Sequence, residues 1–367
     1  MTPLIRRAAR FLTAHVDAPL LGAVLLLLAL GLIVIFSGSN QNPVRVTTQA
    51  VNMLVALGAM YALANIPPHY LMRVAVPLYV LGVLLLVSVA LFGDVVHGAR
   101  RWLHVGVTRI QPSELMKIAV PLMLAWYFDR YEATLRAKNY LIAAVLLVVP
   151  VAFIARQPDL GTALLVFAAG CYTLFLAGLS WRIIIGLAAA GLSAIPFAWP
   201  LLHDYQRQRI LTLFDPMQDP LGSGYHTIQS TIAVGSGGVM GKGWLQGTQT
   251  HLDFIPERTT DFIFAVYSEE FGLLGNTLLL ALFLVVTARG LMITGNAPTL
   301  FTRLLAGAIT LTFFTYAFVN MGMVSGILPV VGVPLPLISY GGTSLVTICL
   351  GLGVLMSIQT HKKLVQS

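Results

Sequence analysis

Four ionisable residues lie within or at the start of long apolar segments, and they are the first candidates for chemistry. They are Glu114, Lys117, Asp159 and Asp261. An ionisable side chain in a segment long enough to cross a membrane is costly, so each is a functional candidate by default.

Asp261 is suited to act as a base. It lies between a polar stretch that ends at Thr260 and the apolar run 262–266. Thr259 or Thr260 is expected to cap the helix, and the helix dipole should keep an aspartate in the first turn ionised. An ionised carboxylate at that boundary could accept a proton from a hydroxyl group. The alternative is that the acid only complements the helix dipole.

The other three candidates also have structural alternatives. Glu114 and Lys117 are three residues apart and therefore neighbours on one helix face. They could bind a substrate, or form an internal ion pair that orders helix packing. Asp159 directly follows Pro158 at a helix start, where complementing the helix dipole is the simpler role for an acid.

A glutamate pair and a glycine-rich stretch are the remaining motifs. Glu269 and Glu270 lie about two turns beyond Asp261 and favour a structural role, either paired with Lys or Arg or marking a polar cavity. The stretch 235–243 does not match a nucleotide phosphate loop. That motif requires Gly at the position of Ser236 and Ser or Thr at the position of Gly243. The backbone N–H groups of the stretch could still hold an anionic head group, with a re-entrant turn as the alternative.

Composition points to a membrane protein. The 367 residues include 22 Lys and Arg and 14 Asp and Glu, and 57% of the chain is hydrophobic. Soluble domains use about 25% charged residues, against 10% here. This excludes a soluble domain, a disordered chain and a nucleic-acid-binding domain. Cys171 and Cys349 both lie in apolar runs, which excludes a disulfide scaffold.

The apolar segments predict an all-α, polytopic membrane protein with about ten transmembrane helices, because each is close to the length that crosses the hydrocarbon layer. The first is expected to be a retained anchor and not a cleaved signal. The fourth contains Lys117, so a re-entrant segment is its alternative. The predicted spans are 18–37, 47–66, 74–92, 112–128, 139–155, 159–178, 181–202, 261–288, 303–327 and 335–359.

The distribution of Lys and Arg predicts the orientation. With the N-terminus inside, the predicted inner loops hold more of them than the short outer loops, so both termini are expected to be cytoplasmic. Even-numbered helices then begin at the outer face. The polar motifs at the starts of the fourth, sixth, eighth and tenth spans are therefore expected to meet on one side of the membrane.

Residues 202–260 form a long predicted outer loop, and loops of that length are usually functional or disordered. This one is not of low complexity and holds four cations: Arg207, Arg209, Lys242 and Arg258. Cations and glycines next to one placed acid suit a lipid-linked diphosphate.

The chain resembles the SEDS (shape, elongation, division and sporulation) peptidoglycan polymerases over essentially its whole length. It is therefore expected to be a single integral membrane domain, 1–367, that includes the loop 202–260. Residues 241–244 (GKGW) and 205–209 (YQRQR) favour the elongation branch over the division branch. The motifs that carry the resemblance are IPP (66–68), GARRWL (98–103), QPSELMK (111–117), QPDLGT (157–162), HDYQRQR (203–209), DPLGSGYHTIQS (219–230), GSGGVMGKGWLQGT (235–248), PERTTDFIF (256–264) and MVSGILPVVGVPLPLISYGG (323–342).

The resemblance implies an enzyme that joins lipid II, a disaccharide peptide on undecaprenyl diphosphate, into glycan strands on the outer face of the bacterial inner membrane. The family's essential acid maps to Asp261, and its other functional positions map to Glu114, Lys117 and Asp159. The implied partner is a class B penicillin-binding protein, a transpeptidase, which for the elongation complex is penicillin-binding protein 2.

The expected chemistry is an inverting transfer, since lipid II is α-linked and the glycan is β-1,4. One base, Asp261, would deprotonate the acceptor hydroxyl. Loop cations, or a divalent ion such as Mg²⁺ or Mn²⁺, would stabilise the departing diphosphate. No cofactor is certain. The alternatives are a lipid II flippase and a non-catalytic scaffold for the transpeptidase.

Overall fold

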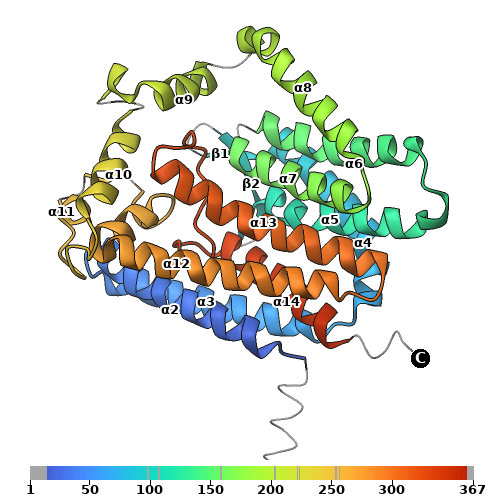
Figure 1. Ribbon diagram of the computed structural model, residues 1–367, viewed down its shortest axis with the longest axis horizontal. Helices are drawn as coiled ribbons and strands as arrows, with labels where there is room; N and C mark the ends of the chain where they lie inside the picture. The colour runs from blue at the N-terminus through green and yellow to red at the C-terminus, as the bar shows by residue number, and fades with distance from the viewer. Residues whose placement is uncertain are drawn as a thin grey trace, which may run out of the picture.

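The computed structural model describes residues 15–96, 99–105, 108–157, 159–201, 204–220, 222, 224–252, 254–255 and 257–361. Within these ranges the chain is a bundle of long helices (Figure 1). One helix coincides with each of the ten predicted spans, so the predicted all-α class is confirmed. Their bounds are α2 Ala18–Gly38, α3 Pro43–Ala64, α4 Pro68–Phe92, α5 Pro112–Arg130, α6 Ala137–Arg156, α7 Leu160–Leu176, α8 Trp181–Ala198, α12 Ile263–Gly295, α13 Leu300–Val324 and α14 Thr343–Thr360.

Seven of the described helices are long and apolar enough to cross a membrane: α2, α3, α4, α6, α12, α13 and α14. α7, and α8 over Trp181–Ala194, are shorter apolar helices. α5 is continuous from Pro112 to Arg130, which does not support the re-entrant alternative for the fourth span. Most of its side chains are buried against other helices, so Glu114 and Lys117 avoid lipid.

The tenth helix begins later than predicted. α14 starts at Thr343, whereas the prediction was residue 335. The reason is the segment 325–342, an irregular loop between α13 and α14 that contains three prolines and has positive φ at Gly332 (72°) and Leu337 (65°). Proline lacks the N–H that a helix interior needs and disfavours helix in the residue before it. We call this segment the 325–342 loop.

The regions outside the bundle contain structure that the sequence did not predict. A three-stranded antiparallel sheet, in the order β1-β2-β3, consists of Asp94–Val96, Ala99–Val105 and Thr108–Ile110. The short helix η2 Trp199–Leu201 precedes the long loop, and the loop holds further helices: α9 Asp204–Phe214, η3 Pro216–Gln218, α10 Tyr225–Ser236 and α11 Thr248–His251. One more short helix, η1 Glu132–Thr134, follows α5.

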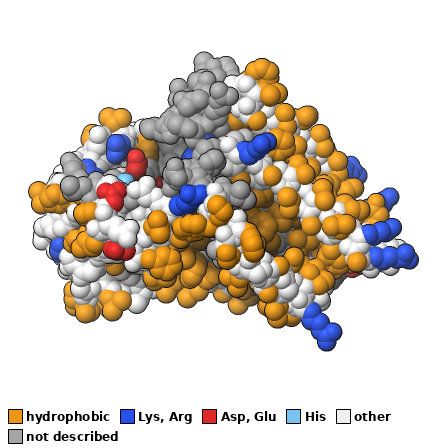
Figure 2. All heavy atoms as spheres, turned by 90° about the horizontal axis from the view of Figure 1, so that it is seen from above, with side chains coloured by type: hydrophobic (Ala, Val, Ile, Leu, Met, Phe, Trp, Pro, Cys, Tyr) orange, Lys and Arg blue, Asp and Glu red, His pale blue; other side chains and the backbone are white. Residues whose placement is uncertain are grey.

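α13 lies in the middle of the bundle and positions the site. It packs against α5, α7 and α12 (Figure 1). Of the residues in its most apolar 18-residue stretch, 72% are buried. α14 packs against α3, and α2 packs against α12. Seen from above, the surface carries a broad apolar area, with charged side chains mainly towards its left and right ends (Figure 2). That distribution suits a bundle whose middle lies in lipid.

Candidate active site

Asp261 lies in a turn just ahead of α12 and not in its first helical turn. The residue at the helix N-cap is Phe262, and no side chain caps this helix. The prediction that Thr259 or Thr260 caps it was therefore wrong. Thr260 Oγ1 instead donates to the Glu257 carbonyl at 3.1 Å and to its carboxylate at 3.0 Å, because residues 257–260 close a turn of their own.

Asn320 of α13 holds the backbone at Asp261. Its Nδ2 donates to the carbonyl oxygen of Asp261 at 2.8 Å and to that of Val333 at 2.7 Å. Asn320 is fully buried. One amide therefore fixes the acid against the 325–342 loop.

Further bonds join the same two segments. Ser339 Oγ donates to the Thr260 carbonyl at 2.6 Å, and the Tyr340 N–H donates to the Thr259 carbonyl at 2.8 Å. The buried Gln49 of α3 in turn accepts from the Gly341 N–H at 3.1 Å and donates to the Ser339 carbonyl at 3.3 Å. The start of α12 is thus held by α3, α13 and the 325–342 loop.

Gly332 allows the loop to approach the acid. A Cβ placed on Gly332 would lie 3.3 Å from Asp261 Oδ2, and its φ of 72° is one that L side chains rarely adopt. The same loop touches α7, since a Cβ on Gly161 would lie 2.7 Å from the Val331 carbonyl oxygen. The starts of α7 and α12 therefore meet across one loop, as the predicted one-sided arrangement requires.

The surroundings of Asp261 raise its pKa from 3.8 to about 6. Burial is the largest cause and the Glu257 carboxylate adds to it, while Arg209 and Arg101 act in the opposite direction. The pKa is therefore raised, whereas the sequence had led us to expect that the helix dipole would keep this acid ionised. Asp261 is still mostly ionised at neutral pH, and a base with a pKa near the working pH is an effective one.

Arg101 of β2 is a candidate that sequence reasoning missed. It lies in the GARRWL motif, but nothing in the sequence connects the hairpin to Asp261. The structure brings it and Arg209 of α9 close enough to influence the pKa of this acid. The motif itself was the available signal.

Glu114 and Lys117 form an ion pair, one of the two alternatives for these residues, with Lys117 Nζ 2.5 Å from Glu114 Oε1. Both residues are buried, and Lys117 Nζ also lies 5.0 Å from the ring centroid of Tyr316 on α13. Asp159 is the N-cap of α7, where its Oδ1 accepts from the Thr162 N–H at 3.2 Å. The helix-start role expected as its alternative is therefore present.

Asp159 also has a second contact that ties two helices together. Gln111, the N-cap residue of α5, donates from Nε2 to Asp159 Oδ2 at 2.9 Å. Through it, the starts of α5 and α7 lie side by side.

A small cavity of about 40 Å³ adjoins the ion pair, between α5, α13 and α14. Its lining is mostly apolar, and the polar members are Lys117, Thr312, Tyr316 and Thr347. Within the described part of the chain, four buried polar atoms in this region make no hydrogen bond: Ser113 Oγ, Glu114 Oε2, Thr312 Oγ1 and Tyr316 Oη. Buried polar atoms of this kind usually bind water or a ligand.

The four loop cations do not form one cluster. Lys242 forms an ion pair with Glu269 at 2.7 Å. Arg207 donates to the carbonyls of Trp199 and Pro200, at 3.0 and 2.6 Å. Arg258 donates to the carbonyl of Thr250. Arg209 is the member of the set whose charge acts on Asp261.

Of the two alternatives for the glycine stretch, binding of an anionic head group by its backbone N–H groups is not supported. The N–H groups of Gly241, Lys242 and Gly243 donate to protein carbonyls at 2.9, 3.0 and 3.0 Å. No three His, Cys, Asp or Glu side chains are grouped to hold a metal ion in the ranges that the structure describes.

Comparisons with known proteins agree with the fold. The family model of the FtsW/RodA/SpoVE cell cycle proteins matches residues 18–364. The chain is 51% identical to the peptidoglycan glycosyltransferase MrdB of Escherichia coli K12 over 352 residues, covering 95% of each chain.

Two solved structures are similar as well. One belongs to a study of the coordination of polymerization and crosslinking by a peptidoglycan synthase complex. It has a TM-score of 0.82 and 33% identity, covering 96% of this chain and 99% of that one. The other is the rod shape determining protein RodA of Thermus thermophilus, with a TM-score of 0.72 and 29% identity, covering 94% and 97%. The chain therefore belongs to the FtsW/RodA/SpoVE (SEDS) family of multi-pass membrane proteins.

Proposed function

We propose that the protein is a peptidoglycan glycosyltransferase that polymerises lipid II into β-1,4 glycan strands, with Asp261 as the general base. The observation that carries this proposal is the placement of Asp261. Its carboxylate lies at the start of α12 with a pKa of about 6 and under the influence of Arg101 and Arg209. The name of the relative MrdB, a peptidoglycan glycosyltransferase, supports the same activity.

The reaction is a direct displacement at the anomeric carbon of the donor. The acceptor 4-hydroxyl oxygen forms the new bond as its proton moves to Asp261, and the bond from the anomeric carbon to the diphosphate oxygen breaks. One displacement inverts the α-linked donor to a β-linked product. Glycosidases need a second carboxyl to protonate a poor leaving group, whereas undecaprenyl diphosphate leaves as an anion that cations can stabilise. Among the loop cations, Arg209 is the best placed for this task, together with Arg101.

We further propose that Glu114, Lys117 and Asp159 bind substrate at the starts of α5 and α7. The buried polar atoms near the ion pair that make no hydrogen bond with the described part of the protein are available to the hydroxyl and amide groups of such a substrate. The other three loop cations would have to give up their contacts with the protein to act on the diphosphate: Arg207, Lys242 and Arg258. A divalent cation such as Mg²⁺ or Mn²⁺ would supply additional charge for the leaving group, but no step requires it.

The proposed location is the bacterial inner membrane, with both termini cytoplasmic and Asp261 on the outer face. Stacking of His15 on His361, with ring centroids 4.4 Å apart, supports a common side for the two ends. Three exposed basic residues lie from the end of α5 to the start of α6, opposite Glu114 along α5: Arg130, Arg136 and Lys138. Cytoplasmic loops are enriched in such residues. The basic residues predicted nearest the chain ends lie outside the described ranges.

The proposed partner is a class B penicillin-binding protein, penicillin-binding protein 2 of the elongation complex. The similarity to a chain of a peptidoglycan synthase complex supports it. The proposed unit is one membrane domain, 1–367, with the loop 202–260 as part of it.

Reconstitution of the full chain with this partner and lipid II tests the proposal. Wild-type protein should form glycan, and Asp261→Asn should form none while it folds and binds the partner. The control is Asp215→Asn, an exposed acid of the same long loop, which should keep wild-type activity. Polymerisation by Asp261→Asn at the wild-type rate would refute the assignment of the base. Leaflet exchange without product would indicate a flippase, and neither activity would indicate a scaffold.

A further inference from the structure

α12 is broken where the long loop enters it. Gly272 has φ 63° and ψ −160°, a conformation that is essentially restricted to glycine. The N–H groups of residues 242–243 donate to the carbonyls of residues 269–270, both at 3.0 Å. The N–H groups of residues 273–274 donate to the carbonyls of residues 238–239, at 2.9 and 3.1 Å. The loop therefore supplies the backbone partners that the helix loses at the break.

The contact between loop and helix leaves no room for side chains on the backbone. A Cβ on Gly241 would lie 2.1 Å from the Glu270 carbonyl oxygen, and one on Gly272 would lie 2.3 Å from the Gly241 nitrogen. The part of α12 before the break, residues 263–271, is thus a separate short helical segment. Asp261 lies just ahead of one end, and the docked loop holds the other.

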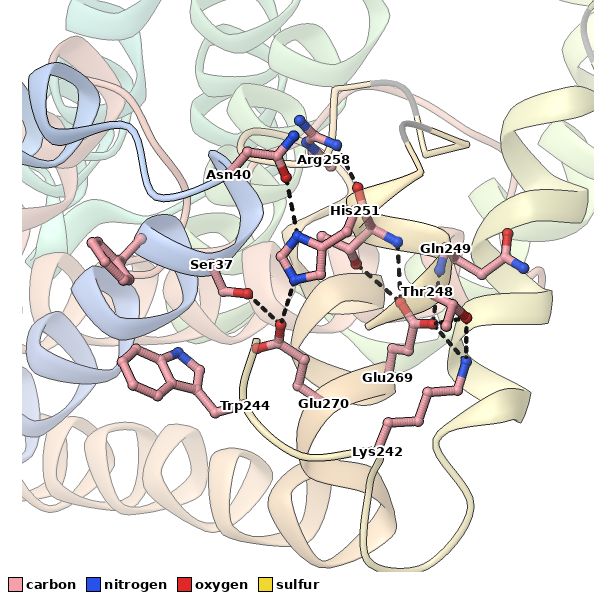
Figure 3. A network of polar contacts seen from close by, with 12 residues as sticks. Ser37, Asn40, Lys242, Trp244, Thr248, Gln249, His251, Arg258, Glu269 and Glu270 are labelled. Atoms are coloured by element: carbon pink, nitrogen blue, oxygen red, sulfur yellow. Dashed lines mark hydrogen bonds and ion pairs between the residues drawn. The ribbon is translucent and has the colours of Figure 1, made fainter. Parts of the chain in front are cut away.

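The Glu269 carboxylate fastens the loop at this break (Figure 3). Its Oε1 accepts from Lys242 Nζ at 2.7 Å, from the Gln249 N–H at 2.9 Å and from Thr248 Oγ1 at 3.2 Å. Its Oε2 accepts from the N–H of Thr250 at 3.2 Å and from its Oγ1 at 3.0 Å. The side chain is wholly buried. Pairing with Lys or Arg was one of the two structural alternatives for this glutamate, and here the lysine comes from the long loop, with the start of α11 as a second partner.

A chain of contacts connects this carboxylate with Asp261. Arg258 donates to the carbonyl of Thr250, in the segment that Glu269 holds, and it lies three residues ahead of the acid (Figure 3). Arg45 of α3 donates to Thr259 Oγ1 at 3.4 Å in the same turn. Displacement of α11 would therefore be transmitted to residues 258–261.

Stability alone gives a weak reason for such a buried charge, because desolvation of an ion pair often cancels its attraction. We propose that Glu269 is a positioning residue. It fixes α11 and Arg258 so that the turn 258–261 presents Asp261 to the acceptor hydroxyl. This inference rests on the proposed function, but its structural half can be tested separately.

The test compares Glu269→Gln with a matched control, Asp17→Asn. Asp17 is also a buried carboxylate that pairs with a cation of α12, Arg289 Nη2 at 2.6 Å, and caps a helix, but it lies at the opposite end of α12. A glutamine cannot replace Glu269, because its NH₂ group would face a ring of donors. Both variants are measured as full-length protein in nanodiscs with the transpeptidase partner.

Glu269→Gln is expected to lower kcat for lipid II about 10- to 100-fold with little change in KM, as is typical when a residue that orients a catalytic group is lost. Hydrogen–deuterium exchange should increase in residues 248–261. Asp17→Asn should leave kcat per folded molecule and exchange in this segment unchanged. Thr250→Val removes one hydrogen bond to Glu269 and keeps the ion pair, so it should show the same effects in weaker form. This variant replaces Glu269→Gln as the test if Glu269→Gln does not fold.

Wild-type kcat together with wild-type exchange in Glu269→Gln would overturn the inference. So would an equal loss in Asp17→Asn, since that would mean general destabilisation. If wild-type protein makes no glycan, the proposed function fails, and the exchange experiment still decides whether Glu269 holds the turn 258–261.

Discussion

Lowering the pH from 8 to 5 is expected to reduce kcat about tenfold, with a midpoint near pH 6. The rate should follow the ionised fraction of Asp261, whose pKa is raised to about 6 chiefly by burial. With that pKa the ionised fraction falls from nearly all at pH 8 to about one tenth at pH 5. An aspartate with the ordinary pKa of 3.8 would remain about 90% ionised at pH 5.

Loss of folding is not expected to cause this decline. The folded protein binds the Asp261 proton more tightly than the unfolded chain, so the protonated acid adds stability below about pH 4. That contribution is lost as the pH rises through 6. A shift from 3.8 to about 6 corresponds to at most about 3 kcal/mol. Asp261→Asn, which carries no charge, should therefore unfold at a higher temperature than wild type at pH 8.

The assay is the initial rate of glycan formation at saturating lipid II between pH 5 and 8, with the transpeptidase blocked. Thermal unfolding is measured at each pH. Two neighbouring charged residues serve as controls, because they shift the pKa of Asp261 in opposite directions. Glu257→Gln should move the midpoint to lower pH, because its carboxylate raises the pKa of Asp261, and Arg209→Gln should move it to higher pH.

A rate that stays constant from pH 7 to pH 5 would refute the reasoning, because an acid with a pKa of about 6 could not then be the base. If the midpoint of the pH profile shifted in neither Glu257→Gln nor Arg209→Gln, the titrating group would be one other than Asp261.

Three further substitutions test the supporting structure. Asn320→Leu leaves two carbonyls without their donor, at about 1–3 kcal/mol each, so both the unfolding temperature and glycan synthesis should fall. Lys117→Met leaves the Glu114 carboxylate buried without its cation and should cost about 3–5 kcal/mol, much of which the double variant with Glu114→Gln should restore in thermal unfolding. Gly272→Ala should cost at least about 1–3 kcal/mol through backbone strain, whereas Gly58→Ala, in open space on α3, should be neutral or stabilising in the same measurement.

The sequence predicted the helices well because their signal is local. Runs of apolar residues located ten helices, and the three-residue spacing of Glu114 and Lys117 showed that these two side chains could pair. The predicted start of α14 was wrong because residues 335–342 have the apolar composition of a span but belong to the 325–342 loop, whose three prolines disfavour a helix. The cap of α12 was wrong because Thr260 bonds within its own turn.

Contacts between distant segments were outside the reach of local patterns. Nothing in the sequence connects Arg101 with Asp261, or Asn320 with the carbonyl groups that it holds. The four loop cations looked alike in the sequence, yet they lie in four different environments. Only the fold separates Arg209, whose charge acts on Asp261, from Lys242, which is paired with Glu269.

By itself, then, the sequence determined that this is an all-α membrane protein of the SEDS family and which acid deserves to be tested first. Scarcity of charge made these properties visible, because a charged side chain in an apolar segment is too costly to be accidental. The tertiary structure decided how that acid is held and how strongly it binds its proton. Both depend on burial and on partners remote in the chain, such as Asn320, Arg209 and the 325–342 loop.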